Sequence, residues 1–162
     1  MALDMFLKLD GIAGESKDKA HKDEIEVLSF SWGASNPVTI GSSSGGAGAG
    51  KVSISSFNFM NHVQKSSPLL FLAMAQGQHI ETALVSVRKA GANADFYKMT
   101  LTNVFVESVQ HSASEGGEED TPTESVSLFF QKVDFEYRQQ LPAGQYGDWV
   151  KFIWDQAFNK EG

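Results

Sequence analysis

The 162-residue sequence contains no cysteine, only four prolines and no long apolar run. Without cysteine the chain can form no disulfide, no thiolate zinc site and no cysteine nucleophile. No segment approaches the roughly 20 consecutive apolar residues that a membrane-spanning helix needs. Basic residues are in the minority, and a net charge of −7 disfavours association with nucleic acid. We therefore expect no nucleic-acid partner, no membrane insertion and a protein made in a reducing cytoplasm.

The first residues of the chain do not have the pattern of a signal peptide. Asp4 stands where such a peptide carries positive charge, and Lys8 interrupts the apolar stretch. We therefore expect that any export uses a route other than a general signal peptide. Hydrophobic residues make up 41% of the chain and charged residues 20%, a balance typical of globular proteins. This length and composition predict a single domain over residues 1–162.

Most of the sequence has the two-residue periodicity of β-strands. Leu28, Phe30 and Trp32 alternate with Ser29 and Ser31, so we expect the apolar set to point into a core. Further strands are predicted at 51–55, 83–89, 96–110, 125–137 and 149–154. The apolar positions change parity near Ser55–Ser56, which predicts a bulge or a bend there.

One helix is predicted over residues 68–76. Ser67 is a candidate N-cap, Pro68 suits the first helical position, and Gly77 suits a left-handed C-terminal cap. Apolar residues surround nearly the whole helix, so we expect the sheets, or the sheets and a second subunit, to cover most of its sides. The predicted fold is mainly β: a single antiparallel β-barrel, formed by two packed sheets, with one α-helix packed alongside.

Three segments between the strands, at 14–24, 40–50 and 112–124, are predicted to be surface loops. The second contains two motif-like patterns. GGAGAGK at 45–51 matches most of a phosphate-binding loop, but Val52 follows where Ser or Thr is required, and a strand rather than a helix is predicted next. GSSSG at 41–45 matches G-x-S-x-G, yet no helix is predicted after it either.

No constellation of catalytic or metal-ligating residues is evident in the sequence. The histidines at 21, 62, 79 and 111 lack metal-ligand spacing, so we expect ordinary surface or capping roles for them. Glu118, Glu119 and Asp120 cluster in a glycine-containing loop that would not hold carboxylates rigidly. We therefore predict no enzyme, no catalytic or metal-binding residue and no cofactor. The alternatives are a hydrolase or nucleotide enzyme that uses residues 41–51, and a small ligand-binding barrel.

Four stretches of the sequence carry a family resemblance in matching order. They are MALDMFLKLDGIAGESKDKAHKDEIEVLSFSWG, GAGKVSISSFNFMNHVQKSSPLLFLAMAQGQHI, VRKAGANADFYKMTLTNVFVESV and TESVSLFFQKVDFEY. Together they resemble the haemolysin-coregulated protein (Hcp) family of type VI secretion systems over nearly the full length. After Tyr137 the chain departs from the family, which often has a Gly-Trp pair in its last strand where this chain has Ile153 before Trp154.

The resemblance implies a structural subunit that assembles into a homohexameric ring with a wide central channel. In that family, rings stack into a tube inside a contractile sheath and beneath a spike protein, and contraction drives the tube out of the bacterial cell. The family also binds small effector proteins in the ring channel and protects them before export. The resemblance therefore implies partners of four kinds: further copies of the chain, the spike protein, the sheath and small effectors.

Two sets of residues are candidates for these roles. The serines that alternate with apolar residues would face the channel and contact cargo; they are Ser29, Ser31, Ser53 and Ser55. An ordinary solvent-exposed sheet face is the alternative interpretation. The loops would contact the next ring, with these candidate residues: Lys17, Asp18, Lys19, Gly45, Gly46, Gly48 and Gly50.

Overall fold

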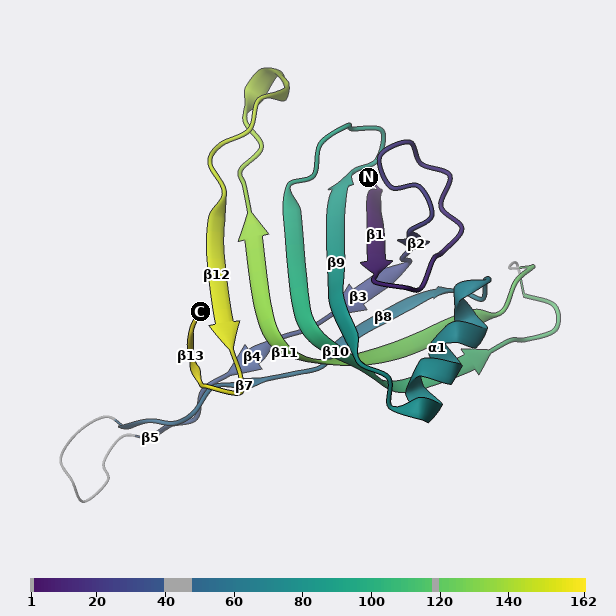
Figure 1. Ribbon diagram of the computed structural model, residues 1–162. Helices are drawn as coiled ribbons and strands as arrows, with labels where there is room; N and C mark the ends of the chain where they lie inside the picture. The colour runs from purple at the N-terminus through teal and green to yellow at the C-terminus, as the bar shows by residue number, and fades with distance from the viewer. Residues whose placement is uncertain (1, 40–47, 118–119) are drawn as a thin grey trace.

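The computed structural model of the protein describes residues 2–39, 48–117 and 120–162 (Figure 1). In chain order its elements are β1 (Leu3–Leu9), β2 (Ile25–Glu26), β3 (Ser29–Ser31), β4 (Ala34–Ser35), β5 (Val38–Thr39), β6 (Gly48–Ala49), β7 (Ser53–Ile54), β8 (Phe57–His62), α1 (Ser66–Gln76), β9 (Ile80–Lys89), β10 (Tyr97–Ser112), β11 (Thr123–Tyr137), the 3-10 turn η1 (Pro142–Gly144), β12 (Val150–Asp155) and β13 (Lys160–Glu161). The prediction of a mainly β protein with antiparallel strands and one α-helix is confirmed.

The two longest strands, β10 and β11, join the parts of the main sheet. β10 pairs with β9, which in turn pairs with β1. β11 pairs along its first half with β8, from Thr123 to Leu128, and along its second half with β12, from Lys132 to Tyr137. Both strands curve strongly between these partners, as Figure 1 shows. Because β10 and β11 curve, the strands that pair with their two halves run in different directions.

Residues 25–31 connect the two extremes of this arrangement. β2 pairs with β1, and β3, just beyond it, pairs with β8. Between them the Val27 N–H donates to the Met5 carbonyl at 2.9 Å, and the Leu28 N–H donates to the Met60 carbonyl at 2.8 Å. The segment therefore leaves one side of the sheet and joins the other within a single residue.

This change of partner corrects the predicted core register. Phe30 and Trp32 pack against the core as predicted, but Leu28 is 46% exposed and the prediction for it is wrong. Val27 is buried instead, so the inward-facing set shifts by one residue where the segment turns from β1 to β8. A comparable break at Ser55–Ser56 is confirmed, because β7 ends at Ile54 and β8 begins at Phe57.

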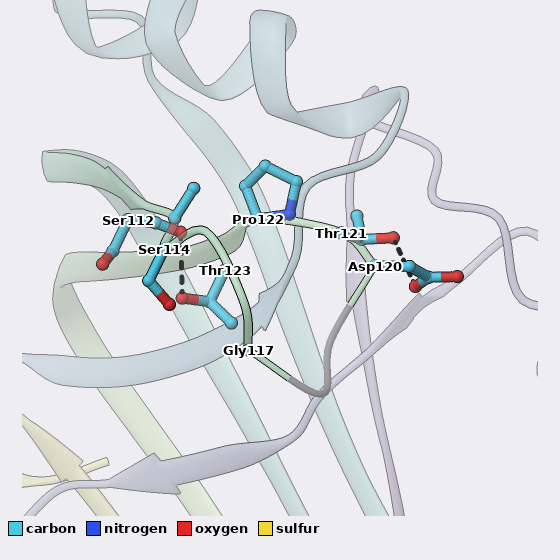
Figure 2. Close-up of a pocket in the computed structure, with 8 residues that line it drawn as sticks. Ser112, Ser114, Gly117, Asp120, Thr121, Pro122 and Thr123 are labelled. Atoms are coloured by element: carbon cyan, nitrogen blue, oxygen red, sulfur yellow. Dashed lines mark hydrogen bonds between the residues drawn. The ribbon is translucent and has the colours of Figure 1, made fainter.

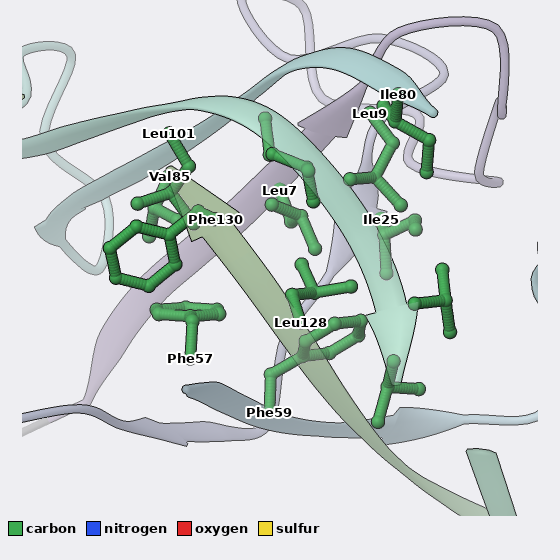
Figure 3. Close-up of a cluster of buried hydrophobic side chains, with 14 of the residues drawn as sticks. Leu7, Leu9, Ile25, Phe57, Phe59, Ile80, Val85, Leu101, Leu128 and Phe130 are labelled. Carbon is green, nitrogen blue, oxygen red and sulfur yellow. The ribbon is translucent and has the colours of Figure 1, made fainter. Parts of the chain in front are cut away.

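The core is one continuous cluster of apolar side chains enclosed by the strands and by one side of α1. Figure 3 shows Leu7, Phe59 and Phe130 extending into the same space from strands that are far apart in the chain. Leu70 and Ala73 of α1 belong to this cluster and are fully buried. The helix is therefore fixed to the sheet by its short buried stripe.

The N-terminal end of α1 differs from the prediction. The helix begins at Ser66, so Ser67 lies inside it rather than at the N-cap, and the Ser67 Oγ accepts a hydrogen bond from the Gln64 N–H at 3.0 Å. The cap comes from the loop before β2, where Glu15 Oε2 accepts from the Lys65 N–H at 2.7 Å. A carboxylate there also complements the positive end of the helix dipole.

The C-terminal end of α1 is as predicted, with Gly77 in the left-handed conformation at φ 61°. The sheet covers one side of the helix. Leu69, Phe71 and Leu72 remain between 37% and 49% exposed on the single chain. Exposed apolar side chains gathered on one helix are a common sign of a protein–protein contact. The sheet alone therefore does not cover most sides of the helix, and cover by a second subunit stays a prediction.

Residues 34–39 and 48–54 form a narrow arm that projects from the body of the protein (Figure 1). β4 pairs with β7, and β5 pairs with β6 further out. The prediction of a loop over 40–50 is wrong for Gly48, which belongs to β6. Gly50 is also ordered: its N–H donates to the Pro37 carbonyl at 3.0 Å, and an added Cβ would lie only 2.7 Å from Pro37 Cγ. Gly45 and Gly46 lie outside the described residues.

Candidate functional surface

Outward-facing side chains, most of them hydroxyls or amides, form rows across β3, β8, β11 and β10. One row joins Ser31, Asn58, Ser127 and Ser108 as successive cross-strand partners. Within it the Ser127 hydroxyl donates to Asn58 Oδ1. The alternation that buries Phe57 and Phe59 on β8, and Val126 and Leu128 on β11, directs this polar set outward.

The adjacent row contains Ser29, Met60, Ser125 and Gln110. We call the two rows together the serine surface. Ser29 and Ser31 are exposed, as the sequence predicts, and the structure brings them together with serines from two distant strands. Sequence reasoning missed Ser125 and Ser127, although they alternate with buried Val126 and Leu128 in the same way.

Ser53 and Ser55 are also exposed but lie outside these rows. Ser53 is in β7 and pairs with Ser35 in β4. The Ser55 hydroxyl accepts a hydrogen bond from the Gly33 N–H at 2.8 Å and donates to the Ser56 carbonyl at 3.2 Å. Both hydrogen bonds of the Ser55 hydroxyl are made to the backbone at the base of the arm, so this side chain stabilises the local structure.

The loop at 14–24 presents only part of its charge to solvent. Lys17 and Lys19 are exposed, whereas the Asp18 carboxylate accepts a hydrogen bond from the Arg88 guanidinium of β9. This hydrogen bond holds the pKa of Asp18 below its usual value. Arg88 Nε also lies 3.5 Å from Asp4 Oδ2. Of the three predicted stacking residues in this loop, Asp18 is therefore tied to the body of its own subunit.

His21 holds the same loop and is not the surface residue that the sequence predicted. It is only 8% exposed, and its ring stacks on Phe6 with centroids 4.3 Å apart. Its Nδ1 lies 3.1 Å from Glu24 Oε2, and its Nε2 lies 3.4 Å from Asp95 Oδ1. The His21 ring is held by Phe6 of β1 and by Asp95, which is distant in the sequence. The spacing of residues in the sequence does not indicate either contact.

A second histidine, His111, partners a fully buried carboxylate. The Glu124 side chain has no exposure, and its Oε2 lies 2.6 Å from His111 Nε2. Phe71 of α1 contacts the His111 ring edge-on at 5.0 Å. His111 keeps the surface position predicted for it, with a side chain that is 36% exposed, and also contacts this buried carboxylate. Sequence reasoning also missed Glu124, which continues the inward-facing alternation of Val126 and could have been found from it.

A shallow pocket of about 260 Å³ lies at the turn between β10 and β11 (Figure 2). Two of its hydroxyl groups bind a neighbouring carboxylate or the backbone: Thr121 Oγ1 donates to Asp120 Oδ1 at 3.2 Å, and Thr123 Oγ1 donates to the Ser112 carbonyl at 3.4 Å. Glu118 and Glu119, of the predicted acidic cluster, lie outside the described residues. The described lining offers short-range contacts that stabilise the turn.

The strand predicted after Lys51 is present as β7, so a helix does not follow the glycine-rich segment. A phosphate-binding loop needs such a helix, whose N-terminus faces the phosphates. Within the described ranges, no helix is both long and apolar enough to cross a bilayer.

The comparisons with known proteins agree with one another. Residues 6–137 match the family model described as "Type VI secretion system effector, Hcp". The chain is 40% identical over 158 residues to Protein hcp1 of Pseudomonas aeruginosa, covering 96% of each. It is 39% identical to the crystal structure of Hcp1 from Salmonella typhimurium, with full coverage of both chains and a TM-score of 0.84. A structure described as a type six secretion system protein superposes with a TM-score of 0.93 at 34% identity, covering 99% of this chain and 100% of that one.

The curved antiparallel sheet, the flanking helix and these matches define a protein of the bacterial type VI secretion class. Within that class, the chain belongs to the Hcp family.

Proposed function

We propose that this protein is the structural subunit of a type VI secretion tube. Six copies form a closed ring, rings stack into a tube inside the contractile sheath and below the spike protein, and the tube leaves the cell without a signal peptide. The ring channel receives small effector proteins before export, so the role is assembly and binding rather than enzymatic chemistry. Membership of the Hcp family is the observation that carries this proposal.

Two features of the subunit support a closed ring. The exposed Leu69 and Leu72 of α1 supply an apolar contact that the single chain does not cover. We also propose that the subunit is a single domain whose strands close into a barrel, because residues 25–31 bridge β1 and β8. A closed barrel has few free strand edges, so subunits would associate through side chains rather than by open-ended strand pairing.

The proposal predicts a stable hexamer in solution. Multi-angle light scattering of the purified protein should give six times the 17.7 kDa subunit mass over micromolar concentrations. Electron microscopy should show rings with an open centre. A monomer across that concentration range would contradict the proposal, since a cyclic assembly needs identical subunits in contact.

We propose that the serine surface lines the channel. Small hydroxyl groups leave the channel wide and offer cargo adaptable hydrogen bonds. Replacing Ser31 with glutamine should therefore leave folding and ring assembly unchanged, because no core volume changes. It should reduce co-purification of a channel-bound effector severalfold.

The measurement compares ring formation by size exclusion with effector recovery from the same cells. Ser114→Gln, at an exposed position in the β10–β11 turn, is the control and should retain the effector. Failure of the Ser31 variant to form rings would place this side chain in a subunit contact. Normal rings with undiminished effector would show that cargo does not use this position.

We propose that the arm and the loop at 14–24 contact the next ring. The arm projects beyond the body, and Lys17 and Lys19 are exposed charges on the loop. Replacing Gly45 to Gly50 by a short turn should leave single rings intact and reduce tube formation and secretion. Secretion equal to that of the wild-type chain would argue against a stacking role.

A further inference from the structure

A cavity of about 640 Å³ opens on the outward side of β10 and β11, next to the end of β12. Phe105 and Phe129 form much of its apolar lining, and His79, Asn103 and Gln131 form a polar side. We call this site the aromatic pocket. Its size lies within the range of about 300–1,000 Å³ that is usual for ligand sites.

The aromatic pocket continues the serine surface. Phe129 follows Ser127 by two residues on β11, so both side chains point to the same face. Phe105 is the cross-strand partner of Phe129 on β10. The two phenyl groups are 36% and 46% exposed, a costly arrangement for a surface that nothing contacts. A protein bound to the serine surface would therefore reach the pocket without leaving that face.

The polar side of the pocket is a directed chain of hydrogen bonds across four segments. Gln131 Nε2 donates to the Asp155 carboxylate at 3.3 Å, and Asn103 Nδ2 donates to Gln131 Oε1 at 2.6 Å. His79 Nε2 lies 2.5 Å from Asn103 Oδ1, and its ring contacts Phe105 at 5.5 Å. Asn103 adopts a left-handed conformation, at φ 55°, within β10.

The direction of this chain fixes the tautomer of His79. An ionised carboxylate can only accept hydrogen bonds, so the Gln131 amide nitrogen must donate to Asp155. The Gln131 carbonyl oxygen is then the atom that accepts a hydrogen bond from the Asn103 amide nitrogen. The Asn103 oxygen must then accept from His79, which places the imidazole hydrogen on Nε2. Neutral His79 consequently keeps a lone pair on Nδ1. The pocket combines aromatic walls with a hydrogen-bond acceptor of defined position.

We infer that the aromatic pocket is an anchor site for a tryptophan side chain on a positively charged segment of a protein held on the serine surface. The indole ring would pack against Phe105 and Phe129, and its N–H would donate to His79 Nδ1. The chain's formal net charge of −7, repeated in every subunit, favours a basic partner. This inference rests on the proposed function, because it assumes that proteins bind to this face.

The probe is a lysine-rich peptide with one tryptophan, compared with the same peptide carrying alanine or phenylalanine. Binding to the full-length protein in its native assembly is measured by fluorescence anisotropy. We expect the tryptophan peptide to bind at least tenfold more tightly than the alanine peptide. Phe129→Ala should remove most of that difference, and His79→Ala should remove the preference for tryptophan over phenylalanine. Phe158→Ala is the control, because Phe158 is 69% exposed and does not line the pocket.

Equal affinity for the tryptophan and alanine peptides would overturn the inference. So would an equal loss of affinity in the Phe158 control, or loss of ring assembly in Phe129→Ala, which would identify the pocket as a subunit contact. Size exclusion of the unsubstituted protein reports separately on the proposed function. A chain that forms no rings would refute the tube, whereas the peptide comparison would still decide whether the pocket selects tryptophan.

Discussion

Replacing Phe57 with alanine should lower the free energy of unfolding by about 3–5 kcal/mol, the usual cost of removing a buried phenyl group. Phe57 has no exposure, and its ring lies 5.4 Å from Phe30 and 6.1 Å from Phe59. Its strand is held on one side by β3 and on the other by β11, so the backbone has little freedom to close the resulting cavity. Urea denaturation at subunit concentrations matched to wild type measures the loss.

Phe158→Ala is the matched control, since it removes the same atoms from a side chain that is 69% exposed. Its effect should stay within about 0.5 kcal/mol. A Phe57→Ala loss below about 1 kcal/mol would mean that the neighbouring strands collapse onto the vacant volume. Because most domains have only 5–15 kcal/mol of stability, the expected loss should also reduce the yield of assembled rings at 37 °C.

Replacing His111 with alanine should cost about 3 kcal/mol, because it leaves the Glu124 carboxylate buried without its partner. Glu124 Oε1 has no hydrogen-bond partner among the described residues, so the contact with His111 through Oε2 carries the polar interaction of this side chain. A buried carboxylate that loses its partner has no ready substitute inside a folded sheet. Chemical denaturation at neutral pH provides the measurement.

Two further variants separate charge from packing. His111→Phe retains an aromatic ring beside Phe71 yet should remain strongly destabilised, because it cannot donate to the carboxylate. Adding Glu124→Gln to His111→Ala should recover part of the loss by making the buried group neutral. If the double variant were no more stable than His111→Ala, the carboxylate charge would not be the cause of the instability.

The alternation of apolar and polar residues predicts most of this fold, because each long strand keeps one face toward the core. β10, β11 and β12 lie within a few residues of their predicted ranges. The failure at Leu28 has a specific origin. A prediction from periodicity requires that a strand keeps the same neighbours along its length. Residues 25–31 instead pair first with β1 and then with β8. A pattern confined to one strand contains no information about that exchange.

The helix and the histidines show a second limit of local reasoning. The Gly77 cap was predictable because the left-handed conformation is a property of the residue itself. The Glu15 cap was not, since it joins residues that are 50 positions apart. His21 likewise acquires its role from Phe6 and Asp95, which only the folded chain brings to it.

The candidate surface was predictable in part for the same reason. Ser29 and Ser31 follow from alternation within β3, and the family resemblance implied a role for them. The aromatic pocket does not follow from either source. Phe105 and Phe129 appear in the sequence as ordinary apolar strand residues, and only their register with the outward-facing serines identifies them as exposed.

The pairing of β1 with β9 has a consequence for synthesis on the ribosome. Leu3 pairs with Lys89, which is made about 4–17 s later at the usual 5–20 residues per second. During that interval the first strand has emerged without its long partner. The nearby β2, which pairs with Phe6 and Leu7, and His21, which stacks on Phe6, are available much sooner. The pairing of β1 with β2 can form early in synthesis. It partly covers the apolar face of β1 until β9 has been translated.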